Sequence, residues 1–151
     1  MDIQQEIKST ANLETSKKVV LNLLFTHNMV AERLNIILKP FDISAEQFNV
    51  LRILRGQKGK PINMGAIQER MIARNSNTTR LVDKLLIKKF VSRANCELNR
   101  RKIEVHILQD GLEVLSLLDP QIIEHELHFA KNLSEDEINT LNNLLEKYRK
   151  Q

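Results

Sequence analysis

The sequence predicts a mainly α-helical fold with one small β-hairpin, and two observations carry this prediction. Apolar residues recur every three or four positions, the helical period, over most of the 151 residues. Between Phe90 and Leu108 the period changes to two, which is typical of paired strands. Four glycines and three prolines leave few places for turns, so we expect long helices in a single domain spanning residues 1–151.

A long helix is expected first, over about residues 14–39. Its most regular stripe is Val20, Leu24, His27, Ala31, Leu34 and Leu38. Further apolar residues widen this stripe nearly all round the helix, which is more than a single surface helix needs. The helix should therefore be buried on two sides, by a partner chain or a deep core. For His27, packing is favoured over lining a ligand cavity, and Pro40 should end the helix.

Two short helices are expected next. Ser44 and Gln47 form a capping-box pattern at the start of the first, and Gly56 is placed to close it in the left-handed conformation. Asn63 can cap the second, which covers residues 64–71.

A third helix is expected over residues 76–85, with Asn75 or Ser76 as its cap. Leu81, Val82 and Leu85 lie at helical spacing and can be buried together. The remaining face is polar and basic, and it consists of Ser76, Asn77, Thr79, Arg80 and Lys84. Two short helices, a tight turn and a helix of this kind make a helix-turn-helix.

The polar face of that third helix is suited to reading base edges in a DNA groove. Arg80 could pair bidentately with guanine, and Asn77 could read adenine. Lys84 is better suited to a phosphate or to solvent. The alternative is that the small polar residues serve only to cap the helix.

The hairpin follows directly, with strands expected over 90–95 and 103–108. Its turn is long and charged, a shape suited to reaching outward. A hairpin after a helix-turn-helix is a wing, so the fold is a winged helix-turn-helix. The wing residues expected to contact DNA are Arg100, Arg101 and Lys102, because a narrow minor groove attracts arginine.

The positive charge is concentrated in this part of the chain. Between Arg74 and Lys102 there are nine lysines and arginines against two acidic residues, a local charge of +7. The whole chain carries +4, so the remainder carries −3. A localised basic patch indicates a polyanionic partner, such as double-stranded DNA, although a solvated basic face is the simpler alternative.

Two further helices are expected from about residue 110 to residue 150. Pro120 should kink the first, and Ser134 to Glu137 form a second capping box. The last helix has one apolar face, made of Ile138, Leu141, Leu145 and Tyr148. The terminal helices carry more apolar surface than the central module can cover. A symmetric homodimer is the simplest way to bury it.

The remaining features mainly exclude functions. Cys96 is the only cysteine, so no intramolecular disulfide can form, and a wing thiol without a partner is expected to be inert. His125 and His128 could begin a metal site, but packing is favoured, so we expect neither metal nor cofactor. No catalytic constellation is present, which argues against an enzyme. Without a signal peptide or an apolar run long enough to span a membrane, the expected location is cytoplasmic.

Together these residues resemble the MarR family of winged-helix transcriptional regulators. The resemblance covers roughly Leu21 to Leu145 and is most specific at residues 78–85 of the third helix and 99–101 of the wing. Residues 107–111 match the family's junction into the next helix. The family often has glycine where Lys89 stands, so the third helix needs a different stop here. The family also usually has threonine where Leu108 stands, so the cap of the next helix should come from Asp110.

The resemblance implies dimerisation helices over about 14–39 and 110–150 and a DNA-binding lobe over about 44–108. It implies a homodimer on a pseudo-palindromic operator, with the third helix in the major groove and a wing arginine in the minor groove. It also implies a small-molecule effector bound between the dimerisation helices and the lobe. We therefore expect a sequence-specific, DNA-binding transcriptional regulator, a dimeric repressor released by a small ligand. The alternative is a winged-helix module that binds a protein partner.

Overall fold

The computed structural model describes residues 1–150 and confirms a mainly helical fold with a small antiparallel sheet. The elements are α1 (Ile3–Glu6), α2 (Thr15–Leu38), the 3-10 turn η1 (Lys39–Phe41), α3 (Ala45–Arg55), β1 (Ile62–Asn63), α4 (Met64–Arg70), α5 (Thr78–Ile87), β2 (Val91–Asn95), β3 (Ile103–Ile107), α6 (Gln109–Ala130) and α7 (Glu135–Arg149). Within residues 1–150, no helix is long and apolar enough to cross a membrane.

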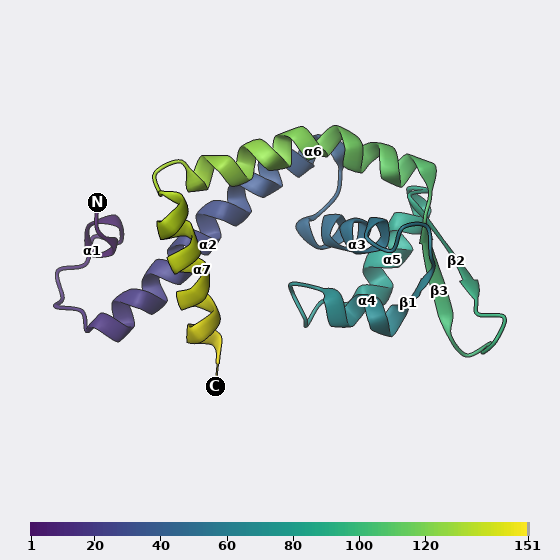
Figure 1. Ribbon diagram of the computed structural model, residues 1–151, viewed down its shortest axis with the longest axis horizontal. Helices are drawn as coiled ribbons and strands as arrows, with labels where there is room; N and C mark the ends of the chain where they lie inside the picture. Colours follow the sequence, from purple (N-terminus) through teal and green to yellow (C-terminus); the bar gives the residue numbers. More distant parts are fainter. Residues whose placement is uncertain (151) are drawn as a thin grey trace.

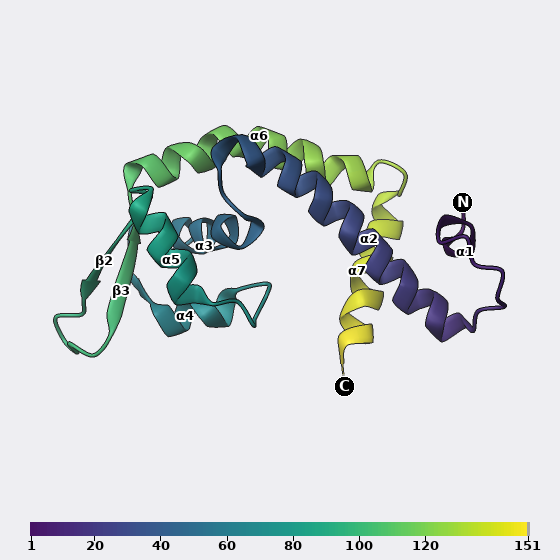
Figure 2. The same cartoon turned by 180° about the vertical axis from the view of Figure 1, so that it is seen from behind.

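The elements form an arch with two unequal ends (Figure 1). One end is a lobe of α3, α4, α5 and the sheet, and the hairpin β2–β3 projects from it. The other end holds α1, α7 and the first part of α2. The long helices α2 and α6 lie side by side along the arch in both views (Figures 1 and 2). The two long helices therefore join the lobe to the terminal helices.

The sheet has three strands in the order β1–β3–β2, all antiparallel. Val91 pairs with Ile107 and Asn95 with Ile103, so the predicted hairpin is confirmed. Sequence reasoning missed β1, where Ile62 pairs with Val105. A two-residue strand has no period to detect, and its pairing partner lies more than forty residues away.

The core lies mainly in the lobe and extends under α6. Its fully buried members include Leu38, Val50, Leu51, Ile67, Val82, Leu85, Val105, Leu115 and Leu118. They come from every helix from α2 to α6 and from the sheet. Burying a side chain of this size contributes about 1.5–3 kcal/mol, so this cluster is what holds α5 in place.

Local signals placed most helix starts correctly. The Ser44 hydroxyl accepts from the Gln47 amide at 3.1 Å, and the capping box at Ser134 is also formed. Asn63 caps α4 by accepting from the Ala66 amide. α6 continues through Pro120, and Figure 1 shows it bent along its length.

Two predictions about helix ends are wrong. Gly56 has φ −62°, an ordinary helical value, because the chain continues for another half turn before it reverses. The left-handed positions are Lys58 and Gly59 instead. Asp110 does not cap α6, since it lies two residues beyond the cap position; Leu108 occupies that position without a side-chain hydrogen bond.

Candidate nucleic-acid interface

The helix α5 is held by a buried face and a fixed turn at its start. Val82 and Leu85 are completely buried against the core. Thr78 is also buried, and its hydroxyl donates to the side chain of Gln68 on α4. The amide of Gln68 donates in turn to the Arg74 carbonyl, so one α4 residue fixes both ends of the turn.

The cap of α5 differs from the prediction. The Asn77 side chain accepts from the Arg80 amide at 3.1 Å, so Asn77 caps the helix rather than Asn75 or Ser76. Asn77 is the cap because it directly precedes the first helical residue, and its carboxamide oxygen can reach the free backbone amide of Arg80, three residues further along. Ser76 is half-buried in the turn before the helix. The helix thus begins and ends two residues later than expected.

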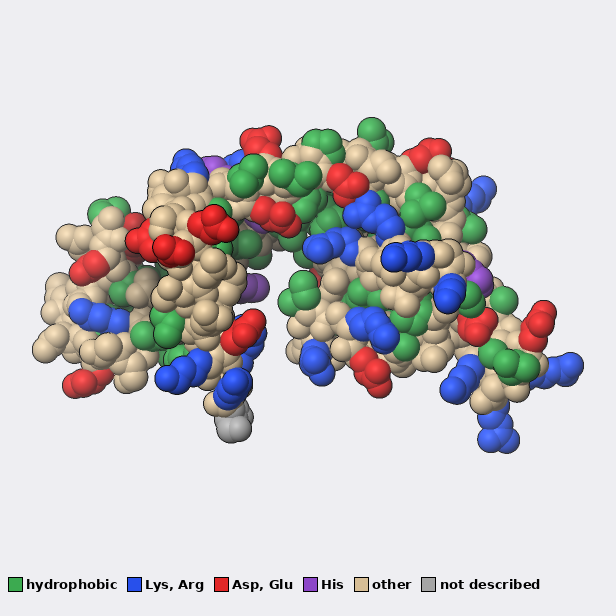
Figure 3. All heavy atoms as spheres, in the orientation of Figure 1, with side chains coloured by type: hydrophobic (Ala, Val, Ile, Leu, Met, Phe, Trp, Pro, Cys, Tyr) green, Lys and Arg blue, Asp and Glu red, His purple; other side chains and the backbone are tan. Residues whose placement is uncertain are grey.

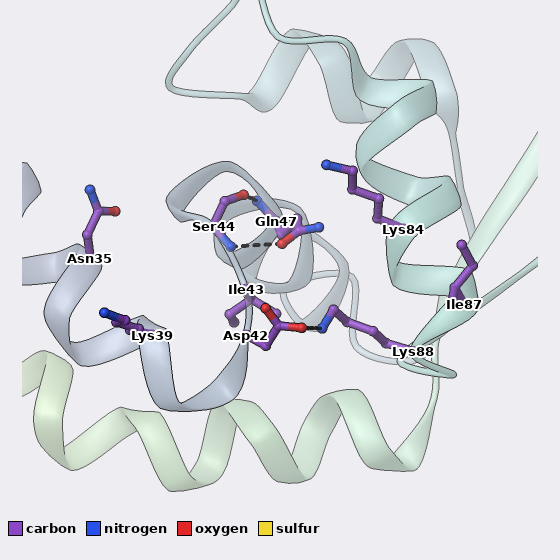
Figure 4. Close-up of a pocket in the computed structure, with 9 residues that line it drawn as sticks. All are labelled: Asn35, Lys39, Asp42, Ile43, Ser44, Gln47, Lys84, Ile87 and Lys88. Carbon is purple, nitrogen blue, oxygen red and sulfur yellow. Dashed lines mark hydrogen bonds and ion pairs between the residues drawn. The ribbon is translucent and has the colours of Figure 1, made fainter.

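The side chains expected to contact DNA differ in their surroundings. Asn77, Thr79, Arg80 and Lys84 are all exposed. Arg80 makes no ion pair within residues 1–150, so its guanidinium can meet a base or a phosphate. Lys84 instead extends toward the start of α3, where it lines a cleft (Figure 4).

An ion pair between α5 and the wing was missed by sequence reasoning. The Arg93 guanidinium on β2 lies 2.5 Å from the Asp83 carboxylate. Asp83 is one of only two acids in the basic segment, which is the signal that could have drawn attention to it. The pair ties the base of the hairpin to the middle of α5.

The wing tip consists of two consecutive turns. The Asn99 amide donates to the Cys96 carbonyl at 3.3 Å, and the Lys102 amide donates to the Asn99 carbonyl at 2.9 Å. The Asn99 side chain accepts from the Arg101 amide at 3.1 Å, which stiffens the second turn.

The three basic residues of this wing are exposed: Arg100, Arg101 and Lys102. Figure 3 shows Lys and Arg side chains projecting from the hairpin. The wing and the exposed face of α5 belong to the same lobe, and together they form a basic surface with hydrogen-bond donors. Such a surface can neutralise phosphates and contact base edges.

Two clefts open beside the lobe. The first, about 700 Å³, lies between the end of α2, the start of α3 and α5 (Figure 4). The second, about 550 Å³, lies between α2, α3 and the α4–α5 turn, and it is mostly apolar, with Val30, Leu34 and Phe48 among its lining residues. His27 is exposed in the single protomer and lines this second cleft.

The two histidines of α6 do not converge with other ligands. Within residues 1–150, no three His, Cys, Asp or Glu side chains are grouped to hold a metal ion. His125 is buried and packs edge-on to Phe129, with ring centroids 5.3 Å apart. Burial lowers the pKa of His125, and the nearby Arg33 lowers it further.

Known proteins are similar to this chain in sequence and in fold. The model of the MarR family matches residues 43–103. The multiple antibiotic resistance protein MarR of Salmonella typhimurium is 30% identical, over 93% of this chain and 98% of its own. A MarR transcription factor from Planctomyces limnophilus is 28% identical, with a TM-score of 0.69 over 90% of this chain and 98% of its own. A cysteine-to-serine variant of Escherichia coli MarR, solved with operator DNA, is 24% identical, with a TM-score of 0.79 over 93% of this chain and all of its own.

Proposed function

The chain belongs to the MarR family and is a transcriptional regulator, and from this premise we propose that it acts as a homodimeric repressor of a pseudo-palindromic operator. In this proposal α5 enters the major groove and the wing enters the adjacent minor groove. The observation that carries it is that one lobe presents Arg80 on α5, which is exposed and makes no ion pair within residues 1–150, and three exposed basic residues at the wing tip. That a variant of E. coli MarR with the same fold was solved with operator DNA supports DNA binding.

The contacts divide by the chemistry of the side chains. Arg80 and Thr79 would read base edges from the first turns of α5, while Lys84 would meet a phosphate. Asn77 keeps its amide nitrogen for DNA, since only its oxygen serves the cap. Ser76, next to the cap, would contact the backbone or a base at the edge of the site. Arg100 or Arg101 would enter the minor groove, and Lys102 would meet the flanking phosphates.

The homodimer is supported by the apolar surface that the terminal helices leave uncovered. α7 buries none of its residues within the chain. Leu24 on α2 is 57% exposed, and Leu144 and Tyr148 on α7 are 58% and 54% exposed. A second copy related by a two-fold axis would cover all of them with the same surface. That symmetry would present two α5 helices to half-sites about one DNA turn apart.

The effector would occupy the mostly apolar cleft between α2 and α3. Its volume of about 550 Å³ lies in the range of small-molecule sites. Arg52 and Asn49 offer polar groups at its wall, and His27 offers a third. Because α2 lines this cleft and is also one of the proposed dimerisation helices, a ligand there would alter how two protomers meet and hence the spacing of their α5 helices.

DNA binding at increasing salt tests the proposal. Each phosphate contacted should add about −0.9 to the slope of log K against log salt. Arg80→Ala should reduce discrimination at one base pair by about 1–3 kcal/mol, whereas Lys84→Ala should weaken binding to all sequences alike. Lys131→Ala, an exposed lysine at the end of α6, is the matched control. A flat salt slope on promoter DNA from the gene's own locus would refute the proposal.

The oligomeric state is tested by light scattering. A stable homodimer in the absence of DNA is expected. A monomer would refute the dimer and would favour the alternative function, in which the terminal helices mate with a different protein.

A further inference from the structure

The tip of the wing, residues 96–102, carries an apolar side chain that the protomer leaves uncovered. Leu98 is 98% exposed, more than any other large apolar side chain in residues 1–150. Its chain neighbours, Glu97 and Asn99, are polar and exposed as well. A single exposed leucine is ordinary on a protein surface, so its role must be judged from its position.

The backbone of the tip holds Leu98 in a fixed place. The Cys96 amide donates to the Lys102 carbonyl at 2.8 Å, which closes the tip where the two strands end. Within the tip, the Asn99 amide donates to the Cys96 carbonyl, so Leu98 is one of the two central residues of a turn. Because these hydrogen bonds already order the backbone, Leu98 would lose little backbone freedom on meeting a partner.

Leu98 shares the tip with the basic residues of the candidate nucleic-acid interface. Asn99 links two turns, because its amide closes the turn of Leu98 and its carbonyl accepts from the Lys102 amide in the next turn. Arg100 and Arg101 are the central residues of that second turn, and both are exposed. Figure 3 shows apolar surface among the charged side chains of the hairpin. Leu98 is therefore continuous with the surface that the proposed function places on DNA.

The charge around Leu98 favours a polyanion as the partner. The tip has three basic residues and one acid, Glu97, so its net charge is two positive units. None of the four forms an ion pair in the part of the chain that the structure describes. A partner must therefore accept both positive charge and one apolar side chain.

The minor groove of DNA meets both needs. Its phosphates attract the basic residues, and its walls consist largely of deoxyribose C–H groups. The groove is about 6 Å wide, so a leucine side chain that enters it meets a wall. Proteins that bind in the minor groove use arginine and lysine there and frequently insert leucine or another apolar side chain.

We propose that Leu98 enters the minor groove beside a wing arginine and packs its side chain against a deoxyribose wall. This inference rests on the proposed function, because it requires the wing to meet DNA. The contact involves no phosphate, so the affinity that it adds does not depend on salt. Glu97 stays outside the groove, since the phosphates repel its carboxylate.

The first test measures binding of the full chain to promoter DNA from the gene's own locus at increasing salt. Leu98→Ala should weaken binding about three- to tenfold for each wing, as expected when roughly half of a leucine side chain is buried. Its line of log K against log salt should run parallel to that of the wild type. Lys102→Ala, which removes a proposed phosphate contact, should instead flatten the slope by about 0.9 for each wing. Unchanged affinity in Leu98→Ala, or a flattened slope, would overturn the contact.

Two control variants show whether the apolar surface of the wing tip itself matters. Leu98→Met keeps an apolar side chain of similar volume and should bind DNA within about twofold of the wild type. Ile87→Ala removes an apolar side chain that is 81% exposed at the end of α5, outside the wing, and should bind like the wild type. All three variants should unfold at the urea midpoint of the wild type, because exposed substitutions rarely change stability. A loss of affinity in Ile87→Ala equal to that in Leu98→Ala would overturn the proposal.

Hydroxyl-radical footprinting locates the contact, because these radicals attack deoxyribose hydrogens that line the minor groove. The wild type should protect sugars in the minor groove beside each half-site. Leu98→Ala, at a concentration that saturates the DNA, should protect these sugars less, while guanines covered by α5 in the major groove stay protected from methylation. Equal sugar protection by both proteins would overturn the contact.

The two levels of the proposal fail in different ways. If the wild type binds no DNA, the proposed function and the Leu98 contact both fail. If the wild type binds DNA and Leu98→Ala binds equally well, only the contact fails, and the exposed leucine is left for a protein partner.

Discussion

Replacing Gly111 with alanine should destabilise the protein, although alanine is normally the better helix former. Gly111 lies in the first turn of α6, where the helix meets the end of α5 and the start of the wing. A Cβ added there would lie 2.5 Å from the Phe90 carbonyl oxygen and 3.0 Å from a side-chain carbon of Ile107. The nearest of these atoms belongs to the backbone, so a rotamer change cannot relieve the contact.

The size of the effect follows from opposing terms. Alanine gains about 0.8–1 kcal/mol over glycine inside a helix. Forcing an extra methyl into a closed contact costs about 1–3 kcal/mol. Moving the Phe90 carbonyl also weakens its hydrogen bond with the Leu108 amide, now 2.9 Å, which contributes about 0.5–1.5 kcal/mol. The net loss expected for Gly111→Ala is about 1–3 kcal/mol.

Urea denaturation followed by circular dichroism measures the change. All variants must be compared at one protein concentration, because the unfolding of a dimer depends on concentration. Gly65→Ala is the matched control, since its Cβ would meet only the Asn63 side chain at an ordinary 3.4 Å. That change should be neutral or stabilise α4 by up to about 1 kcal/mol. If Gly111→Ala is as stable as Gly65→Ala, the close approach of α6 to Phe90 is not a constraint.

Three further predictions concern Lys89, His125 and the ion pair of Arg55 with Asp119. Lys89→Gly should stabilise the chain by about 0.5–1 kcal/mol in the same denaturation assay, because Lys89 has φ +61°, where a side chain is strained. Burial lowers the pKa of His125, so the folded state favours its neutral form. The wild type should therefore lose stability as the pH falls through 6.5, the ordinary value, and His125→Gln should lose less. Arg55 and Asp119 form two hydrogen bonds of 2.8 and 3.0 Å but are both partly exposed, so a double-mutant cycle should give a coupling of about 0.5–1 kcal/mol that salt reduces.

The elements that the sequence predicted are those governed by short-range patterns. The period of apolar residues locates α2, α3, α6 and α7, because each of these helices carries an apolar face. The capping boxes at Ser44 and Ser134 act over three residues and are visible in the sequence. The end of α3 was misplaced because Gly56 can adopt either conformation, and only the length of the following turn decides which.

The sequence predicted which residues make up the candidate nucleic-acid interface, but not how these residues are arranged. The basic segment identified α5 and the wing, because charge needs no knowledge of the fold. The sequence did not identify which residue caps α5, because several small polar residues precede this helix. The choice of Asn77 depends on Thr78 being buried against Gln68. The pair of Asp83 with Arg93 depends on the packing of a strand against a helix, which no local pattern encodes.

The contacts between the lobe and the long helices limit how DNA binding could be regulated within one protomer. The backbone of Phe90 is in close contact with α6 at Gly111, and Arg55 joins α3 to α6 through Asp119. A third, weaker contact is the exposed ion pair of Lys88 with Asp42, which joins the end of α5 to the loop after α2. With both ends of the lobe held, a free hinge between lobe and long helices is not expected. In the proposed dimer, one route remains: a change in how two protomers meet along the terminal helices would alter the spacing of the α5 helices. A panel of operators with altered half-site spacing tests this route, because a change in the spacing of the α5 helices would change the discrimination between these operators.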